Sequence, residues 1–281
     1  MTPRLWVDYT AALTGASKVG LLELGRTLRP YNESIILIGG WVPYLLLQQH
    51  DQAPGDFVHV GSIDVDFLVD PARVGEDEYA TIVELISQAG WRPKEGSRFS
   101  FFRTIDGPDG RPYEIKVDFL TPDVVGAGAG HRHRPIQRDL YARTMDDAEL
   151  ALAHHTQVHM DGRLPGGADS EADIKLLDLI GCIGTKAIAL GDRYKQKDAY
   201  DLVSVLDRYD SGVRDVAQAV RPFVRDPLVA RPLEVLRNKF RTEHSEGPVW
   251  YAEFLGGDRE ASERASQRAF QLVREFGRLI D

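Results

Sequence analysis

Two stretches of the sequence alternate charged and apolar residues with a period of two, and this alternation narrows the possible folds more than any other feature. The stretches cover residues 61–70 and 113–120. Successive side chains of a β-strand point to opposite faces of a sheet, so each stretch predicts a strand with one apolar and one charged face. On the charged faces lie Asp64 and Asp66 in the first stretch, and Glu114, Lys116 and Asp118 in the second.

The acidic face of the first strand has two interpretations while that strand is considered alone. Asp64 and Asp66 repel each other, and they resist joint ionisation unless a positive charge lies between them. They therefore form either a solvated strand face or part of a site. If the second strand is a neighbour, Asp118 joins them around one point, and three carboxylates are the hard oxygen ligands that Mg²⁺ prefers. One ion, or two ions about 4 Å apart, can clamp a phosphate during in-line transfer.

The remaining pattern of the first half predicts a mixed α+β unit around a small sheet. Turn-forming residues at 106–110 separate two strand patterns, so an antiparallel hairpin is expected there. The glycine-rich residues 126–130 do not lie between a strand and a helix, which favours a flexible connection over a dinucleotide-binding loop. The expected helices cover 16–28, the segment from Trp41 onward and 76–89, and the expected strands cover 34–38, 61–70, 99–105 and 113–120.

The second half predicts mainly helices. A short extended piece near residues 156–159 and a loop at 161–169 precede them. We therefore expect two domains, an α+β domain over residues 1–145 and a mainly helical domain over residues 146–281 that completes the cleft of the first. The helical patterns cover 171–190, 195–208, 213–222, 228–241 and 258–279.

Charge and composition exclude several classes of protein. The chain has 281 residues and a net charge of −9, which argues against a general nucleic-acid-binding surface. A local basic groove remains compatible with this charge. Residues 131–138 are a candidate for it, although a solvated, mobile loop is the favoured interpretation of that run. No apolar run approaches the roughly 20 residues that cross a bilayer, and the N-terminus lacks a signal-peptide pattern. With Cys182 as the only cysteine, neither disulfides nor a zinc site are expected. We expect a cytoplasmic protein without a membrane segment.

Residues outside the acidic pair have the chemistry to bind a triphosphate. Gly39 and Gly40 follow a predicted buried strand and precede a helix, so their backbone can approach phosphates closely. Ser62 lies on the face of Asp64, where its hydroxyl can hydrogen-bond a phosphate, and ordinary turn chemistry is the alternative. Lys116, on the charged face of the second strand, is a further candidate for nucleotide binding.

Charged residues in the helical half have helical spacing. Lys186 and Arg193 are seven residues apart and share a helix face, as do Asp198 and Asp201, three residues apart. A lysine near the phosphates neutralises charge that develops during transfer. Asp198 can orient that lysine or Arg193, or take a proton from the attacking hydroxyl. An ordinary surface salt-bridge network is the alternative interpretation.

The order of these motifs resembles the nucleotidyltransferase superfamily that shares the DNA polymerase β-type palm. Its pattern is Gly-Gly or Gly-Ser, then Asp-hydrophobic-Asp, then a third acid on a later strand. The distance between the first two parts is longer here than is usual, which an enlarged loop at residues 51–60 would explain. In this chain the three parts are Gly39-Gly40, Asp64-Val65-Asp66 and Asp118.

The helical half is similar to the AbiEii/AbiGii toxin family, which includes the MenT-type toxins. Residues 186–193 match its Lys-x-x-Ala-Leu-x-x-Arg motif, and residues 197–201 match Lys-Asp-x-x-Asp. Residues 116–118 match its Lys-hydrophobic-Asp motif. The matched motifs cover roughly residues 35–206, and no part of the chain after about residue 210 adds to them.

The resemblance implies a polymerase β-type palm followed by a mainly α-helical region. It implies transfer of a nucleoside monophosphate from an NTP to a hydroxyl, with release of pyrophosphate and the tRNA 3′ end as acceptor. It also implies that the protein acts as the toxin of a toxin–antitoxin or phage-defence pair and has a cognate antitoxin as partner. The expected metal ligands, for Mg²⁺ or Mn²⁺, are Asp64, Asp66 and Asp118. The expected catalytic residues are these three with Lys186 and Asp198, and the nucleotide-binding residues are Gly39, Gly40, Ser62, Lys116, Lys186 and Arg193.

Three alternatives remain open at the level of sequence. A small-molecule nucleotidyltransferase acting on an aminoglycoside suits the acidic net charge, because such an acceptor is cationic. A catalytically silent NTP-binding module would keep the fold without releasing pyrophosphate. A kinase-like use of the same residues would move phosphate rather than nucleotide.

Overall fold

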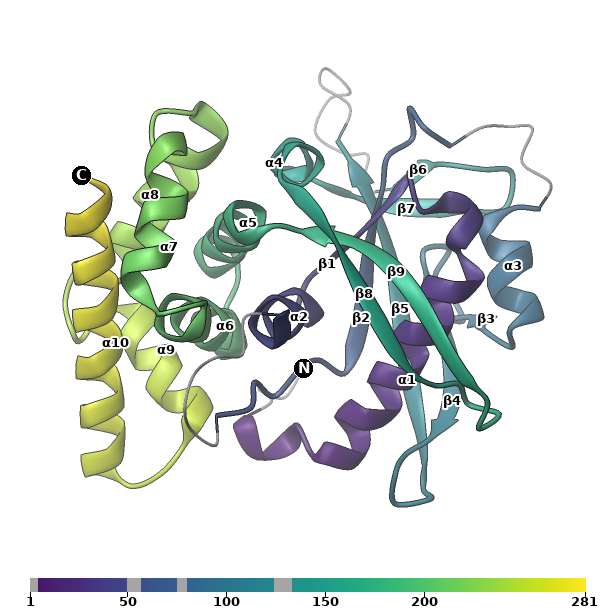
Figure 1. Cartoon of the computed structure of the whole chain (residues 1–281), viewed down its shortest axis with the longest axis horizontal. Coiled ribbons are helices and arrows are strands. Elements are labelled where there is room, and N and C mark those ends of the chain that lie inside the picture. Colours follow the sequence, from purple (N-terminus) through teal and green to yellow (C-terminus); the bar gives the residue numbers. More distant parts are fainter. Residues whose placement is uncertain (1–4, 50–56, 75–79, 124–132) are drawn as a thin grey trace. The chain divides into compact units, whose positions relative to one another are not determined.

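The computed structural model describes residues 5–49, 57–74, 80–123 and 133–281 (Figure 1). The chain forms two compact units. The sheet unit comprises Ala11–Trp41 and Ser62–Leu177, and the helical unit comprises Met1–Thr10, Val42–Gly61 and Asp178–Asp281. The division at residue 145 suggested by the sequence differs from these bounds and stays a prediction about domains. The α+β class, with a mixed sheet and a largely helical C-terminal region, is confirmed.

The centre of the sheet is built from the two strands that the alternating pattern predicts. β2 (Asp64–Val69) pairs in parallel with β5 (Pro112–Pro122) and antiparallel with β1 (Ile35–Ile38). The predicted hairpin is present, since β4 (Ser100–Asp106) pairs antiparallel with β5 across the turn. This order places β2 and β5 side by side between β1 and β4.

Further strands extend the sheet on both sides. On the β4 side, β3 (Arg92–Pro93) pairs with β4. β7 (Tyr141–Met145) pairs in parallel with β5 and antiparallel with β6 (His133–Pro135). On the β1 side lie β9 (Asp169–Leu177), parallel to β1, and β8 (His155–Arg163), antiparallel to β9.

Helix α1 (Ala11–Thr27) packs against the apolar face of the sheet (Figure 1). A Cβ atom added at Gly20 would lie 3.0 Å from Ile105 and 3.4 Å from Ile115, so this glycine lets the helix approach the strands closely. α3 (Ile82–Gln88) begins with a capping box of Thr81 and Glu84, which satisfies backbone N–H groups at its first turn. α4 (Ala148–Ala153) contacts β1 and β5.

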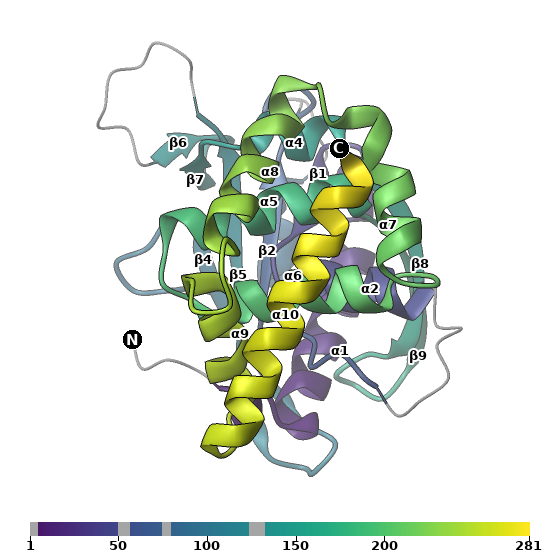
Figure 2. The ribbon, with the colours of Figure 1, turned by 90° about the vertical axis from the view of Figure 1, so that its left-hand side faces the viewer.

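The helical unit is a cluster of helices whose apolar faces pack on one another. α10 shows the pattern most clearly, because its buried residues Ala269, Val273, Phe276 and Ile280 recur every three or four positions. Figure 2 shows this helix along its length, and it contacts α6, α7 and α9. The helices are α5 (Leu179–Asp192), α6 (Gln196–Arg208), α7 (Val213–Val220), α8 (Pro227–Lys239), α9 (Glu246–Leu255) and α10 (Arg259–Ile280), with most of α2 (Trp41–Gln49).

The sequence predictions for the second half are wrong in several places. Helix α4 is not predicted, and part of the loop expected at 161–169 is strand, because β8 extends to Arg163. The helix expected over 171–190 begins only at Leu179, because residues 169–177 form β9. Its buried residues Ala172, Ile174 and Leu176 have strand periodicity. Helix α9 was also not predicted. Four predicted segments lie wholly or partly outside the described residues. They are the first part of the enlarged loop expected at 51–60, the first part of the helix expected at 76–89, the segment 126–130 and the start of the basic run 131–138.

None of the helices in the described ranges is both long and apolar enough to cross a membrane.

Candidate functional site

Four of the predicted site residues lie on one face of the sheet. The parallel register of β2 and β5 places Asp66 opposite Asp118 and Asp64 opposite Lys116. Val65 and Val117, between them in sequence, are fully buried on the other face. The alternation therefore divides the two strands as the sequence predicts, and we call Asp64, Asp66, Lys116 and Asp118 the acid face.

Lys116 bridges two of these carboxylates. Its Nζ lies 2.9 Å from Oδ2 of Asp118 and 3.6 Å from Oδ2 of Asp64. The lysine side chain is 24% exposed, and those of Asp64 and Asp118 are 40% and 10% exposed. Partial burial lowers the pKa of the Lys116 ammonium, but the negative charges of Asp64 and Asp118 outweigh it, so the pKa lies above the ordinary lysine value. The lysine is therefore charged at neutral pH.

Ser100 is a member of the site that the sequence did not reveal. It lies opposite Asp118 in the β4–β5 register, and its Oγ donates a 2.6 Å hydrogen bond to Oδ1 of Asp118. With Lys116 on Oδ2, both carboxylate oxygens of Asp118 are held. The alternation of side chains along β4 could have identified Ser100. Phe101 and Ile105 are buried on one face of this strand, so Ser100 lies on the opposite face, next to the acids.

The glycine turn after β1 lies directly against Asp66. Gly39 has a φ of +80°, in the region that favours glycine, and a Cβ atom there would lie 2.5 Å from Oδ2 of Asp66. The register of β1 with β2 explains the proximity, because Ile38 is opposite Asp66. Gly40 completes the turn before α2, and Ser62 is buried just ahead of β2. The turn and the acid face are thus parts of one local structure.

The side-chain types of the acid face suit a divalent cation, but their arrangement in this structure does not. Asp64, Asp66 and Asp118 supply hard oxygen donors of the kind that Mg²⁺ and Mn²⁺ bind. Yet across the described ranges no three His, Cys, Asp or Glu side chains are arranged to hold a metal ion. At the acid face, the ammonium of Lys116 stands between two of the carboxylates.

Lys186, Asp198 and Arg193 come together in the helical unit. The Nζ of Lys186 lies 3.0 Å from Asp198 and 2.5 Å from Asp201. Arg193, at the end of α5, donates to the other oxygen of Asp198 from its Nε at 3.0 Å. The two aspartate side chains have no exposed surface. Lys186, Asp198 and Asp201 therefore form a buried network on α5 and α6, which the half-exposed side chain of Arg193 joins from the surface, rather than the surface network that the alternative interpretation described.

Two further residues, His59 and Lys197, complete this buried cluster. Lys197 donates to Asp201 at 2.6 Å. His59 accepts a hydrogen bond from the backbone N–H of Gly61 at its Nδ1, so its Nε2 carries the proton and donates to Asp201 at 3.1 Å. The aromatic ring of Tyr200 lies beside His59, with the centroids 4.9 Å apart. His59 gave no signal in the sequence, because it lies far from α6 along the chain.

Burial and charge determine the protonation of the buried cluster. Burial lowers the pKa of His59 to about 4 and that of Lys197 to about 8. Burial opposes the ionisation of Asp198, but the charges of Lys186 and Arg193 dominate and its pKa falls to about 2. Burial also disfavours the charged form of Lys186, yet Asp201 and Asp198 hold its pKa above the ordinary value. At neutral pH the lysines and aspartates are ionised and the imidazole is neutral.

The lone cysteine is not a candidate nucleophile. Cys182 is buried on α5, and burial raises the pKa of its thiol to about 12. The thiolate is the reactive form of cysteine, and it is not populated at neutral pH here.

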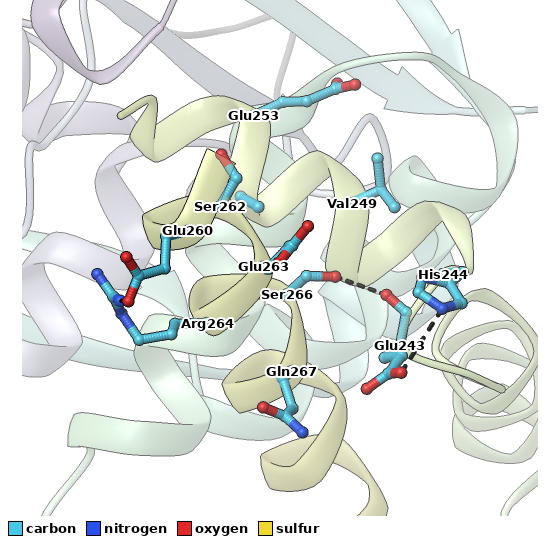
Figure 3. A pocket seen from close by; sticks show the side chains of 11 residues that line it. Glu243, His244, Val249, Glu253, Glu260, Ser262, Glu263, Arg264, Ser266 and Gln267 are labelled. Atoms are coloured by element: carbon cyan, nitrogen blue, oxygen red, sulfur yellow. Dashed lines mark hydrogen bonds and ion pairs between the residues drawn. The ribbon is translucent and has the colours of Figure 1, made fainter. Parts of the chain in front are cut away.

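The pockets described in the structure are not lined by the predicted site residues. One of about 550 Å³ lies in the helical unit beside α9 and α10 (Figure 3). Several of its glutamates already have partners, since Glu253 accepts from Tyr194 and Glu260 pairs with Arg264. Another, of about 390 Å³, lies in the sheet unit beside Arg26, Arg29 and His159. The acid face is a better candidate, because its charged groups converge.

Comparison with known proteins yields one similar structure. No family profile matches the chain, and no curated protein matches its sequence. The chain is similar to a solved structure, an antigenic nucleotidyltransferase-like protein from Paracoccidioides brasiliensis, with a TM-score of 0.42 and 14% sequence identity. The similarity covers 85% of this chain and 91% of that protein. A match of this strength does not establish shared function, so the candidate site stands on its own geometry.

Proposed function

We propose that the protein is a nucleotidyltransferase that moves a nucleoside monophosphate from an NTP to a hydroxyl group and releases pyrophosphate. The observation that carries this proposal is the parallel register of β2 and β5, which sets Asp66 beside Asp118 with Asp64 on the same face. Three carboxylates on adjacent strands, with a glycine turn against one of them, are what an NTP with its divalent ion requires.

Under this proposal the acid face binds the ion and the glycine turn contacts the phosphates. Asp64, Asp66 and Asp118 would hold the divalent ion, which would supply positive charge to offset that of the phosphates. The backbone of the turn at Gly39 and Gly40 would face the phosphates, where the lack of side chains permits close approach. Ser100 keeps the carboxylate of Asp118 in a fixed orientation, ready to bind the ion or to accept the proton of the attacking hydroxyl.

The acceptor that we propose is the 3′ end of an RNA. Aromatic side chains paired with basic ones occur on the strands beside the acid face. Lys94 lies 5.5 Å from the ring centroid of Phe102, and Arg98 lies 4.8 Å from that of Tyr141. Rings on which bases stack, beside cations that attract phosphates, are the usual means of binding single-stranded nucleic acid. This local surface favours RNA over a cationic small molecule, despite the net charge of −9.

The finer assignment rests on the sequence motifs. The resemblance of residues 116–118, 186–193 and 197–201 to the AbiEii/AbiGii toxins supports tRNA as the acceptor and a toxin of a toxin–antitoxin or phage-defence pair as the role. A cognate antitoxin would then be the partner. In that assignment Lys186 and Asp198 are catalytic residues, and Lys186 and Arg193 also bind the nucleotide.

A labelling experiment tests the proposal directly. The protein is incubated with Mg²⁺ and each α-³²P-labelled NTP, together with bulk tRNA or an aminoglycoside. Label transfer to tRNA, with pyrophosphate release that Asp66→Asn abolishes, is the expected result. Transfer to the aminoglycoside would replace the RNA acceptor, and transfer only from γ-labelled ATP would indicate a kinase. No transfer from any NTP would contradict the proposal.

A further inference from the structure

The geometry points to Lys116 as a built-in counterion of the acid face, which a divalent cation must displace in order to bind. This inference rests on the proposed function, because it concerns how the same site accepts its ion. It assigns to Lys116 a role that is separate from contacting the nucleotide: the lysine and the ion compete for the same carboxylates.

The position of the ammonium is the first argument. Its Nζ is within 4 Å of both Asp64 and Asp118, which belong to different strands. An ion bound by these carboxylates would occupy the same space between them, and two cations there would repel each other. Lys116 therefore shields the like charges of the acids from one another while no ion is bound.

The surroundings of Lys116 permit it to leave. Its side chain is 24% exposed, so the ammonium can move into water by rotation about its flexible stem. Asp118 would keep its orientation when the lysine departs, because Ser100 holds its other oxygen at 2.6 Å. Lys186, which also lies between two aspartates, is only 6% exposed and has no such exit.

The consequence is coupled binding of ion and nucleotide. When the ion displaces Lys116, the freed ammonium remains tethered to β5 next to the acid face. A triphosphate at the glycine turn would then provide its new partner. The ion alone should bind weakly, because it must displace the lysine, and it should bind more tightly when a nucleotide is present to accept the released charge.

Binding of Mn²⁺, followed by electron paramagnetic resonance without nucleotide, tests this competition. Lys116→Met removes the charge and keeps the length of the stem, so we expect Mn²⁺ affinity to rise roughly tenfold. Lys116→Arg keeps the charge and should remain within about twofold of wild type. Lys94→Met is the matched control, because it removes a lysine from the same region of the sheet that contacts none of the acids, and it should also stay within about twofold.

The outcomes separate this inference from the proposed function. Unchanged or weaker Mn²⁺ binding by Lys116→Met would overturn the inference, and pyrophosphate release by the wild type would still support the function. Tighter Mn²⁺ binding by Lys116→Met, with no pyrophosphate release from any NTP, would support the counterion role of Lys116 and contradict the proposed function. Absence of Mn²⁺ binding in every variant, together with no pyrophosphate release from any NTP, would overturn both. A non-hydrolysable NTP analogue should raise the Mn²⁺ affinity of the wild type more than that of Lys116→Met.

Discussion

The molecule contains the same charged arrangement twice, a lysine between two aspartates, in two different environments. In the sheet unit, Lys116 lies between Asp64 and Asp118, and the three side chains are 10% to 40% exposed. In the helical unit, Lys186 lies between Asp198 and Asp201, and no side chain of the three exceeds 6% exposure.

The difference in exposure indicates that the carboxylates of the acid face can exchange Lys116 for another cation, whereas those of the buried cluster cannot exchange Lys186. The partly exposed lysine can be replaced by another cation at small cost, because water solvates both it and the acids. Removing one member of a buried network leaves an uncompensated charge that is expensive to keep. We therefore expect the acid face to control activity and the buried cluster to control stability, and the following variants test that division.

The largest effect is expected for Asp66→Asn. Loss of this carboxylate should lower the rate of nucleotide transfer by at least roughly 10³-fold, because it removes a proposed ligand of the ion that stabilises the transferring phosphate. Steady-state kinetics with labelled NTP measure the rate, and thermal unfolding should change little. Glu114→Gln is the control. It also replaces a carboxylate by an amide, at an exposed position on the face of β5 that carries Asp118, and it should keep most of the activity. Equal losses in both variants would refute a specific role for Asp66.

The same substitution at the two lysines compares the environments directly. Lys186→Met should reduce the free energy of unfolding by about 3–5 kcal/mol, because it leaves Asp198 and Asp201 buried with fewer positive partners. Lys116→Met should cost less than about 1 kcal/mol, since its ion pairs are partly solvated. Chemical denaturation of both variants measures the difference. Similar costs at the two positions would show that burial does not distinguish them.

The buried cluster should also make stability depend on pH. The pKa of His59 is about 4 in the folded chain, below the ordinary value of 6.5. Between these values the unfolded chain binds a proton that the folded chain does not, so stability is complete above pH 6.5 and falls as the pH is lowered to 4. The loss is on the order of 3 kcal/mol.

Denaturation of His59→Gln over the same pH range isolates the contribution of this histidine. The slope of stability against pH between 6.5 and 4 should be shallower than in wild type. His159→Gln is the control. Its exposed imidazole hydrogen-bonds Asp173, which raises its pKa, so its contribution has the opposite sign, and the decline towards pH 4 should persist. An unchanged slope in His59→Gln would refute the assignment.

The smallest effect is expected at Ser100. Ser100→Ala removes the hydrogen bond to Asp118 and should cost about 1 kcal/mol of stability. Activity should fall by roughly tenfold, because the carboxylate is then less firmly oriented. Thr104→Ala, on the same face of β4, is the matched control and should behave as wild type. If Ser100→Thr restores activity where Ala does not, the hydroxyl rather than the size of the residue is responsible.

The central part of the fold was readable from the sequence because its signals are local. Alternation in β2 and β5 gave both the strands and the face that carries Asp64, Asp66 and Asp118. The same rule predicts β9 from the alternating buried residues of 171–177, although the apolar pattern that continues after them favours a helix over 171–190.

Other features depend on contacts that sequence spacing does not encode. Helical spacing predicts one shared face for Lys186 and Arg193, but α5 ends before Arg193, whose side chain is exposed, while Lys186 is buried. His59 reaches Asp201 only because the segment that precedes β2 packs on α6, and Ser100 reaches Asp118 through the register of a hairpin. Burial depth and long-range pairing were therefore found only in the structure.

The parallel pairing of β2 and β5 makes the acid face sensitive to chain length. One residue inserted within β5 before Lys116 would turn Asp118 toward the apolar face and bring Val117 among the carboxylates. An insertion in the turn between β4 and β5 would leave both strands in register, because their pairing is set by the flanking residues. We therefore expect natural insertions and deletions to fall in the connections and to spare these two strands, so that the pattern of length variation among relatives would itself outline the site.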